Sequence, residues 1–318
     1  MPSHCIELRG LEYRFGPTAA VAGLDLEVGE GDAFGFLGLN GAGKTTTLRL
    51  ALGLLRPRSG SVRVLGRDLR REPAGLRRIG VLFEDFAAYP YLTAYEHLRL
   101  QASLYGLHGE ELSREVGVWL ERVGLSAAAG KKVCEFSLGM PRRLGIACAF
   151  VHAPDVVFLD EPTNGLDPQG IHDLRGLLQE LRTDRGTTFF ISSHILGEVE
   201  KGCDRVGIIH RGRLLVEGDV EALTASAEAA CRLRVSDGEA TTSLLSGEEW
   251  CGTVRLVDSS SQTGATLELG VGEADVPRLV RVVSAAGIDI LEVRPLFKSL
   301  EDIFRETIAA AEHKRRAS

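Results

Sequence analysis

The stretch Gly38-Leu39-Asn40-Gly41-Ala42-Gly43-Lys44-Thr45 decides the fold of this chain, because it fits the pattern G-x-x-x-x-G-K-[ST] of a phosphate-binding loop. The apolar residues before it, 33–37, predict a short buried strand, and the residues from Thr46 to Leu52 predict the start of a helix. A phosphate-binding loop joins a strand to a helix in this way. We therefore expect an α/β fold that binds a nucleoside triphosphate.

The residue types in this loop suit a phosphate chain. Glycine lets the backbone turn tightly, so that successive N–H groups point at phosphate oxygens. The N-terminus of the following helix also favours an anion. Lys44 is expected to reach the β- and γ-phosphates, and the Thr45 hydroxyl is expected to coordinate Mg²⁺.

Composition narrows the class of protein. The 318 residues are enough for two domains, and the net charge of −7 gives no basic surface for nucleic acid. No apolar run is long enough for a membrane-spanning helix, and the first residues do not resemble a signal peptide. The six cysteines show no paired short spacing, which indicates reduced thiols in a cytoplasmic protein. Any association with a membrane must then come through a partner.

Acidic residues follow two predicted buried strands. The strand 79–83 precedes Glu84 and Asp85, and the strand 156–159 precedes Asp160 and Glu161. Ligands bind at the carboxyl ends of strands in α/β folds. Asp160 is therefore expected to hold Mg²⁺, and Glu161 to accept a proton from an attacking water. For each pair, solvated carboxylates at a strand end are the alternative interpretation.

Three further residues stand at ends of predicted elements. His194 follows the buried strand 187–191, so that it would reach the same sheet edge, although a lone histidine is more often structural. Ser137 is interpreted as the N-cap of the apolar helix that follows it, with Pro141 in the first turn. Asp167 is predicted to cap another helix, with Pro168 as its first residue.

The chain divides into two predicted domains. Residues 1–225 carry the loop and the strand series, with a helical insertion over 90–130 inside a subdomain of about 87–150. Residues 226–318 predict a small α+β domain without a catalytic cluster. Its strands are expected at 230–235, 253–257, 266–269 and 288–293, and its helices at 275–286 and 299–311.

Taken together, these stretches resemble the ATP-binding subunits of ABC transporters over roughly residues 4–225. Gly38 to Thr45 matches the Walker A loop, Ser137-Leu138-Gly139-Met140 the ABC signature, and Val156 to Glu161 the Walker B strand with its catalytic glutamate. Asn164 to Asp167 matches the D-loop, and His194 the switch histidine. Phe15 stands where the family places an aromatic that stacks on adenine, although a core phenylalanine is an equal alternative.

The resemblance implies a fold and a mechanism. The fold would be a P-loop NTPase of ABC type, with a mixed sheet core, antiparallel N-terminal strands and a helical insertion. Two copies would pair head to tail around two ATP molecules, so that Ser137 and Gly139 of one copy contact the γ-phosphate bound by the other. The dimer would drive a separate permease from the inner face of the cell membrane, with the helical insertion as the docking surface. Glu84 and Asp167 would couple the nucleotide state to this partner.

Two positions depart from the family pattern. Glu84 stands where glutamine is usual, so the side chain keeps acceptor oxygens for Mg²⁺ but loses the amide donor. A glutamate at this position, together with the Ser-Leu-Gly-Met form of the signature, resembles the exporters that give bacteria immunity to lantibiotics and bacitracin. Pro141 removes an N–H group close to the signature. The cargo itself is not readable from the chain.

Two other classes of protein fit the sequence less well. An ABC ATPase acting on nucleic acid or ribosomes would usually carry two ATPase domains or a long coiled coil, and this chain shows neither. A GTPase would carry an Asn-Lys-x-Asp guanine motif, which the sequence lacks. The transporter ATPase is the interpretation that the motifs favour, and the nucleic-acid ATPase is the alternative.

Overall fold

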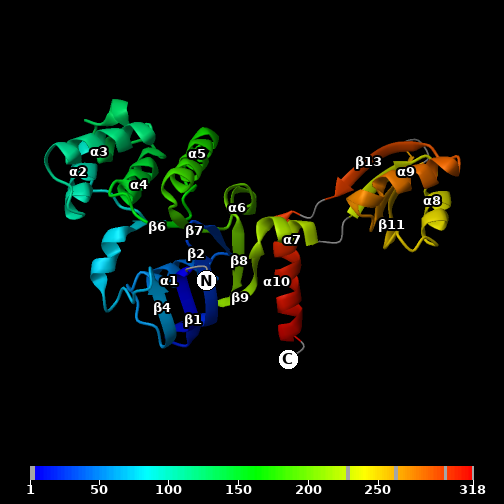
Figure 1. Cartoon of the computed structure of the whole chain (residues 1–318), viewed down its shortest axis with the longest axis horizontal. Helices are drawn as coiled ribbons and strands as arrows, with labels where there is room; N and C mark the ends of the chain where they lie inside the picture. Colours follow the sequence, from blue (N-terminus) through cyan, green and yellow to red (C-terminus); the bar gives the residue numbers. More distant parts are fainter. Residues whose placement is uncertain (1–3, 227–229, 261–263, 297–298, 317–318) are drawn as a thin grey trace. The chain divides into compact units, whose positions relative to one another are not determined.

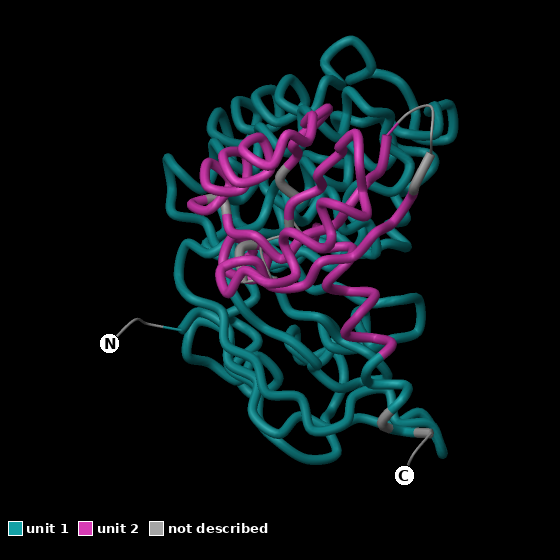
Figure 2. The backbone as a smooth tube through the Cα atoms, turned by 90° about the vertical axis from the view of Figure 1, so that its right-hand side faces the viewer, with its two compact units in different colours: residues 1–219, 310–318 teal, residues 220–309 magenta. Residues whose placement is uncertain are grey.

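A computed structural model describes residues 4–226, 230–260, 264–296 and 299–316. The chain forms two compact units, shown in two colours in Figure 2. The first comprises residues 1–219 together with 310–318, and the second residues 220–309. Each unit is described by itself below.

A mixed six-stranded sheet forms the centre of the first unit, in the order β5-β6-β7-β3-β8-β9. The first five strands in this order run parallel, and β9 pairs antiparallel with β8. The strands are β3 (Ala33–Leu37), β5 (Ile79–Leu82), β6 (Val156–Asp160), β7 (Thr188–Ser193), β8 (Arg205–His210) and β9 (Arg213–Asp219).

Continuous apolar sequence explains the middle of this sheet. Every residue of β3, β6 and β7 is buried, as expected for parallel strands covered on both faces. Phe190 on β7 stands at the centre of an aromatic cluster, with ring centroids 5.6, 5.2 and 5.5 Å from those of Phe34, Phe36 and Phe158. These packed rings give the strand ends a rigid base.

A second, antiparallel sheet lies in the same unit, in the order β2-β1-β4. Its strands are β1 (His4–Phe15), β2 (Thr18–Gly29) and β4 (Ser59–Val64). Alternating residues of β1 and β2, such as Ile6, Leu8 and Leu24, enter the core that also holds α1 (Lys44–Ala51). This sheet therefore supports the helix that follows the phosphate-binding loop.

The predicted helical insertion is present. It contains α2 (Ala94–Leu104) and α3 (Gly109–Arg122), which gather with α4 (Met140–Phe150) at one end of the first unit (Figure 1). Leu112, Val116, Trp119 and Leu120 are the buried residues of α3 and share one helical face. The Trp119 ring stacks on Phe150 of α4 at 5.5 Å, so the insertion packs on the helix that follows the signature.

The remaining helices of the first unit are α5 (Pro168–Arg185) and α6 (Leu196–Gly202), with short 3-10 turns at 73–78, 126–128 and 133–135. Asp167 caps α5 as predicted, because its Oδ1 accepts from the Gly170 N–H at 3.0 Å, and Pro168 is the first helical residue. No helix within the described residues is both long and apolar enough to cross a bilayer.

The second unit has the strand and helix order β-α-β-β-α-β of a ferredoxin-like fold. Its antiparallel sheet has the order β11-β12-β10-β13, and it encloses a core of its own that includes Leu233, Leu267 and Leu279. The elements are β10 (Ala230–Val235), α8 (Gly238–Leu245), β11 (Val254–Ser260), β12 (Gly264–Leu269), α9 (Val276–Ala285) and β13 (Ile290–Leu296), with α7 (Val220–Ser226) before them and a 3-10 turn at 273–275. The last helix, α10 (Leu300–Arg316), begins in this unit, and its residues from 310 on belong to the first unit.

Candidate functional site

The topology of the large sheet brings the predicted site residues to one edge. Strands β5, β6, β7 and β3 are parallel neighbours, so their carboxyl ends lie side by side. Glu84 follows β5, Asp160 is the last residue of β6 and Glu161 the residue after it, and His194 follows β7. The phosphate-binding loop follows β3, and this edge is where α/β sheets bind ligands.

The phosphate-binding loop is shaped by close backbone contacts. Gly43 has a φ of 111° and caps α1. A Cβ atom at Gly43 would lie 2.3 Å from the Ala20 carbonyl oxygen of β2, and one at Gly38 would lie 2.7 Å from the Ile209 carbonyl oxygen. Lys44 is buried and its Nζ donates to the Gly38 carbonyl at 2.7 Å, so the ammonium lies inside the curve of the loop. This cradle fits a phosphate chain.

Hard oxygen atoms meet beside the loop. The Thr45 hydroxyl donates to Asp160 Oδ2 at 2.7 Å, and the Ser192 hydroxyl donates to the other oxygen of Asp160. The described residues contain no cluster of three or more His, Cys, Asp or Glu side chains that would cage a metal. Mg²⁺ bound with a nucleotide typically uses one or two protein oxygens, phosphate and water, so this donor set fits it. Ser192 had no predicted role.

Glu161 connects the loop to His194. Its Oε1 lies 3.2 Å from Lys44 Nζ, and its Oε2 lies 2.8 Å from His194 Nδ1 and accepts from the His194 N–H at 3.2 Å. The Glu161 side chain is 4% exposed, whereas that of His194 is 44% exposed. Glu161 also has a φ of 50°, an uncommon conformation for a residue other than glycine. Glu161 thus contacts both of the other predicted catalytic residues, Lys44 and His194.

The loop after β5 contacts the D-loop. Glu84 is exposed, and its Oε1 accepts from the Asn164 side-chain amide at 3.1 Å. Asp85, the second acid of that pair, forms an ion pair with Arg49 instead, at 3.7 Å. Of the two acids after β5, Glu84 is therefore the one joined to a neighbouring loop of the site.

The signature loop differs from the prediction at Ser137. Helix α4 begins at Met140, with Gly139 as N-cap and no side-chain cap, so the prediction that Ser137 caps it is wrong. A turn separates Ser137 from the helix, because the Met140 N–H bonds the Ser137 carbonyl at 3.1 Å. Ser137 is exposed, which leaves its hydroxyl accessible from outside the chain. A Cβ at Gly139 would lie 3.0 Å from the Gly165 carbonyl, so this loop packs on the D-loop.

Phe15 has an accessible ring. It ends β1, is 54% exposed, and meets the Tyr13 ring edge-on with centroids 4.9 Å apart. An exposed ring supported from one side is suited to stacking on a planar base, in contrast to the alternative of a core phenylalanine. The core alternative is thereby excluded for this residue.

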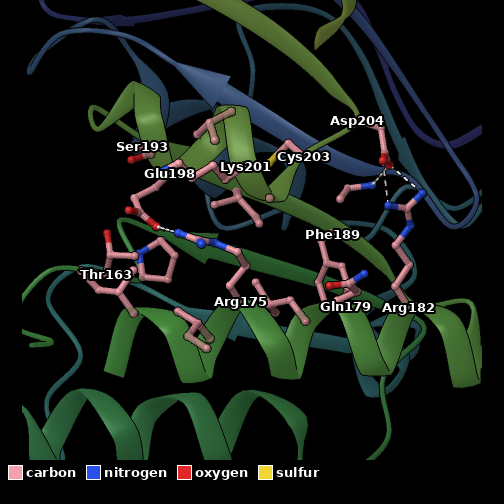
Figure 3. A pocket seen from close by; sticks show the side chains of 18 residues that line it. Thr163, Arg175, Gln179, Arg182, Phe189, Ser193, Glu198, Lys201, Cys203 and Asp204 are labelled. Carbon is pink, nitrogen blue, oxygen red and sulfur yellow. Dashed lines mark hydrogen bonds and ion pairs between the residues drawn. The ribbon is translucent and has the colours of Figure 1, made fainter. Parts of the chain in front are cut away.

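A cavity of about 240 Å³ lies near the site but outside the phosphate-binding loop (Figure 3). Apolar residues of α5, α6 and β7 line it, among them Leu174, Val199 and Phe189. Ion pairs of 2.7 Å, Arg175 with Glu198 and Arg182 with Asp204, lie among its lining residues. Because the loop residues 38–46 are not among the residues lining it, this cavity is not the phosphate site.

Comparison with known proteins identifies the family. The family model described as ABC transporter matches residues 21–164, and a second model described as an AAA domain matches residues 133–200. A bacitracin transport ATP-binding protein of Bacillus licheniformis is 38% identical over 315 residues, which covers 96% of this chain and 98% of that protein. The chain belongs to the ATP-binding proteins of ABC transporters.

Other members of the family support this assignment. An uncharacterized ABC transporter ATP-binding protein of Bacillus subtilis is 36% identical, with 98% of this chain and 97% of that protein covered. The solved structure of an ABC transporter ATP-binding subunit matches with a TM-score of 0.65 and 32% identity, covering 70% of this chain and 92% of that one. The chain is therefore an ATPase subunit of an ABC transporter, and its nucleotide is ATP.

Arg142 is a site residue that sequence reasoning missed. It is buried in the first turns of α4 and bonds backbone carbonyls at the ends of β5 and β6. Arg142 stands two residues after the signature stretch 137–140, and no spacing rule predicts that its guanidinium points back into its own site.

Proposed function

We propose that two copies of this chain pair head to tail, hydrolyse ATP between them, and drive a separate permease that exports an amphiphilic drug or peptide antibiotic. The observation that carries the catalytic part is the chain of contacts Lys44–Glu161–His194 beside Thr45 and Asp160. It places a cation, a carboxylate and an imidazole at the end of the phosphate-binding loop.

Each residue has a separate task in this proposal. Lys44 and the loop N–H groups hold the triphosphate, and Thr45 and Asp160 hold Mg²⁺, which when bound neutralises charge on the β- and γ-phosphates. Glu161 orients and deprotonates the attacking water, because its carboxylate is fixed on both oxygens next to the loop. His194 keeps that carboxylate in place and, being partly exposed, reaches toward the γ-phosphate. Phe15 stacks on the adenine.

The proposed dimer rests on the direction of the signature loop. Leu138 is 87% exposed and Ser137 is exposed, so this loop presents itself to another molecule. A serine hydroxyl and the following helix N-terminus suit a γ-phosphate held by a second copy. A relative of 26% identity and TM-score 0.63 was solved as a dimer bound to ADP and Pi.

The permease would dock on the helical insertion, at the cytoplasmic face of the membrane. Large apolar side chains are exposed there, with Tyr89 60%, Tyr91 83% and Leu104 70% accessible. Tyrosine is enriched at protein interfaces. Tyr89 follows Glu84 by five residues, and Glu84 would coordinate the metal and, with Asp167 of the D-loop, report the nucleotide state to the permease.

The export direction is proposed from the relatives. The alignment with the bacitracin transport protein covers 96% of this chain, so it includes the second unit as well as the ATPase core. In the organism that encodes this chain, deletion of its gene should raise sensitivity to bacitracin-like peptides. The unchanged gene should restore resistance, and the Glu161→Gln version should not. Unchanged sensitivity after deletion would contradict this cargo class.

The dimer is tested with the same variant. Glu161→Gln should bind Mg-ATP normally and hydrolyse it about 10²–10³-fold more slowly, because the base is gone. Light scattering should then show twice the monomer mass with Mg-ATP and the monomer mass without it. Adding Ser137→Glu places a negative charge against the γ-phosphate and should abolish the dimer. A variant that hydrolyses ATP at the wild-type rate would exclude Glu161 as the base.

A further inference from the structure

Arg142 makes a set of contacts that the motif assignments leave unexplained. It is the third residue of α4 and only 7% exposed. Its guanidinium donates to five backbone carbonyl oxygens: Nη1 to Phe83 at 2.8 Å and Glu84 at 3.5 Å, Nη2 to Asp160 and Glu161 at 2.5 Å each, and Nε to Pro162 at 3.1 Å. One side chain thus bonds the chain segments that follow β5 and end β6.

Only an arginine can make this set of contacts. Guanidinium offers five N–H donors in a rigid planar fork, whereas an ammonium donates from one nitrogen and an amide from one NH₂ group. Burial lowers the pKa of Arg142, while the nearby carboxylates of Asp160, Glu84 and Glu161 act in the opposite direction. A buried cation is costly unless it is well bonded, so the carbonyl cage is a specific arrangement.

Three of the carbonyl groups that Arg142 bonds, at residues 160–162, belong to the backbone around Glu161, whose carboxylate is the proposed base. Glu161 has its unusual φ of 50° at the point where Arg142 Nη2 holds its carbonyl. A left-handed conformation of this kind persists when surrounding contacts over-determine it. If those bonds were lost, Glu161 could relax toward an ordinary conformation, and its carboxylate would leave the position between Lys44 and His194.

We infer that Arg142 is a positioning residue for Glu161, and that it links the signature loop of a chain to the catalytic carboxylate of the same chain. The link is physical, because α4 begins directly after Gly139 of the signature loop and Arg142 lies in its first turn. A movement of the signature loop against a partner copy would thus move the β6 end through these carbonyl bonds. The inference rests on the role of Glu161 proposed above.

The test compares Arg142→Gln and Arg142→Lys with the wild type. Arg142→Gln should lower kcat about 30- to 100-fold, since displacement of a catalytic group by 1 Å can cost about 10²-fold. The Kd for ATP should stay within about twofold, because the phosphate-binding loop is bonded to other groups. Arg142→Lys keeps the charge but donates from one nitrogen, so it should recover only part of kcat. If Arg142→Gln does not fold, the comparison is made between Arg142→Lys and the wild type.

A matched control removes Arg205, which begins β8 and therefore lies at the opposite end of the strand from the carboxyl ends that carry the site. Arg205 forms ion pairs with Glu217 at 2.7 Å and Asp32 at 3.3 Å, and bonds the Glu27 carbonyl at 3.2 Å. Arg205→Gln should therefore lower the melting temperature and leave kcat near the wild-type value. A parallel loss of kcat in both variants would make the effect of Arg142 one of general stability and would overturn the inference.

A double-mutant cycle tests whether Arg142 acts through Glu161. In the Glu161→Gln background, single-turnover hydrolysis should fall less than about threefold on adding Arg142→Gln, because the group being positioned is already absent. A full additional loss would overturn the inference. If Glu161→Gln hydrolyses ATP slowly but Arg142→Gln keeps the wild-type kcat, this inference is overturned and the proposed function is not. Wild-type hydrolysis by Glu161→Gln would overturn the proposed function and this inference together.

Discussion

Two independent features of the backbone exclude a side chain at position 43, which is glycine. Its φ of 111° lies in a region that L-residues rarely adopt, and a Cβ would approach the Ala20 carbonyl oxygen to 2.3 Å. The strain of the backbone alone costs about 1–2 kcal/mol, and the contact must in addition push the loop away from β2. Because the same backbone directs N–H groups at the phosphates, the loss should appear in binding as well as in stability.

Gly43→Ala is therefore expected to raise the Kd for Mg-ATP at least about 100-fold, as measured with a fluorescent ATP analogue. Gly186→Ala is the matched control, because Gly186 has a φ of 64° and no neighbouring heavy atom within 4 Å of the position that a Cβ would take. That variant should lose about 1–2 kcal/mol of unfolding free energy and bind ATP normally. Equal affinities in the two variants would show that the contact with β2 does not shape the loop.

At the scale of elements, His152 joins the helical subdomain to the large sheet. Its ring stacks on Tyr105 with centroids 3.5 Å apart, and its Nε2 donates to the Ile79 carbonyl of β5 at 3.1 Å. The other nitrogen, Nδ1, is buried without a hydrogen-bond partner among the described residues. Burial lowers the pKa of His152 to about 4, because protonation would place a charge on that enclosed nitrogen.

A lowered histidine pKa makes this junction sensitive to acid. The unfolded chain takes up a proton near pH 6.5, whereas the folded chain does so only near pH 4, so folding stability falls as the pH drops through this window. The loss should reach about 2–3 kcal/mol. His152→Phe keeps the ring stack and removes the proton site, so its unfolding free energy in urea should fall less between pH 6.5 and 4. If the unfolding free energy falls equally between pH 6.5 and 4 in the wild type and in His152→Phe, the acid sensitivity does not come from His152.

Elements and motifs were more predictable from sequence than their contacts. The run 33–52 predicted a strand, a loop and a helix, and these are β3, the phosphate-binding loop and α1, because the pattern is local. The Ser137 cap failed because a turn intervenes before α4, and a capping preference alone does not fix where a helix starts. Arg142 was missed because its acceptors come from segments distant in sequence, at 83–84 and 160–162.

The second unit shows the same difference between local and distant information. Strand alternation predicted β10 to β13, but helix α8 (Gly238–Leu245) was not expected, since Thr241, Thr242 and Ser243 are poor helix formers. Asp237 caps this helix by accepting from the Ala240 N–H at 3.0 Å. The sheet order β11-β12-β10-β13 arises from pairings that alternation does not specify.

At the scale of the whole molecule, the two units have separate hydrophobic cores. The core with Phe34, Phe158 and Phe190 lies in the first unit, and the core with Leu233 and Leu267 lies in the second. A segment with its own core can unfold as its own cooperative unit. Every residue proposed to bind ATP belongs to the first unit, so the ligand should stabilise that unit alone.

The sequence contains two tryptophans, and each unit holds one of them. Trp119 is 2% exposed on α3, and Trp250 packs against the second core with Arg278 over its ring at 4.9 Å. Trp250→Phe leaves only Trp119, so its fluorescence reports on the first unit, and Trp119→Phe leaves only Trp250, so its fluorescence reports on the second. Each variant is combined with Glu161→Gln to prevent turnover. Mg-ATP at about 100 times its Kd should add about 2.7 kcal/mol to the unit that binds it. Mg-ATP should raise the melting temperature reported by Trp119 and leave the melting temperature reported by Trp250 unchanged. An equal rise of both melting temperatures would mean that the two units unfold together.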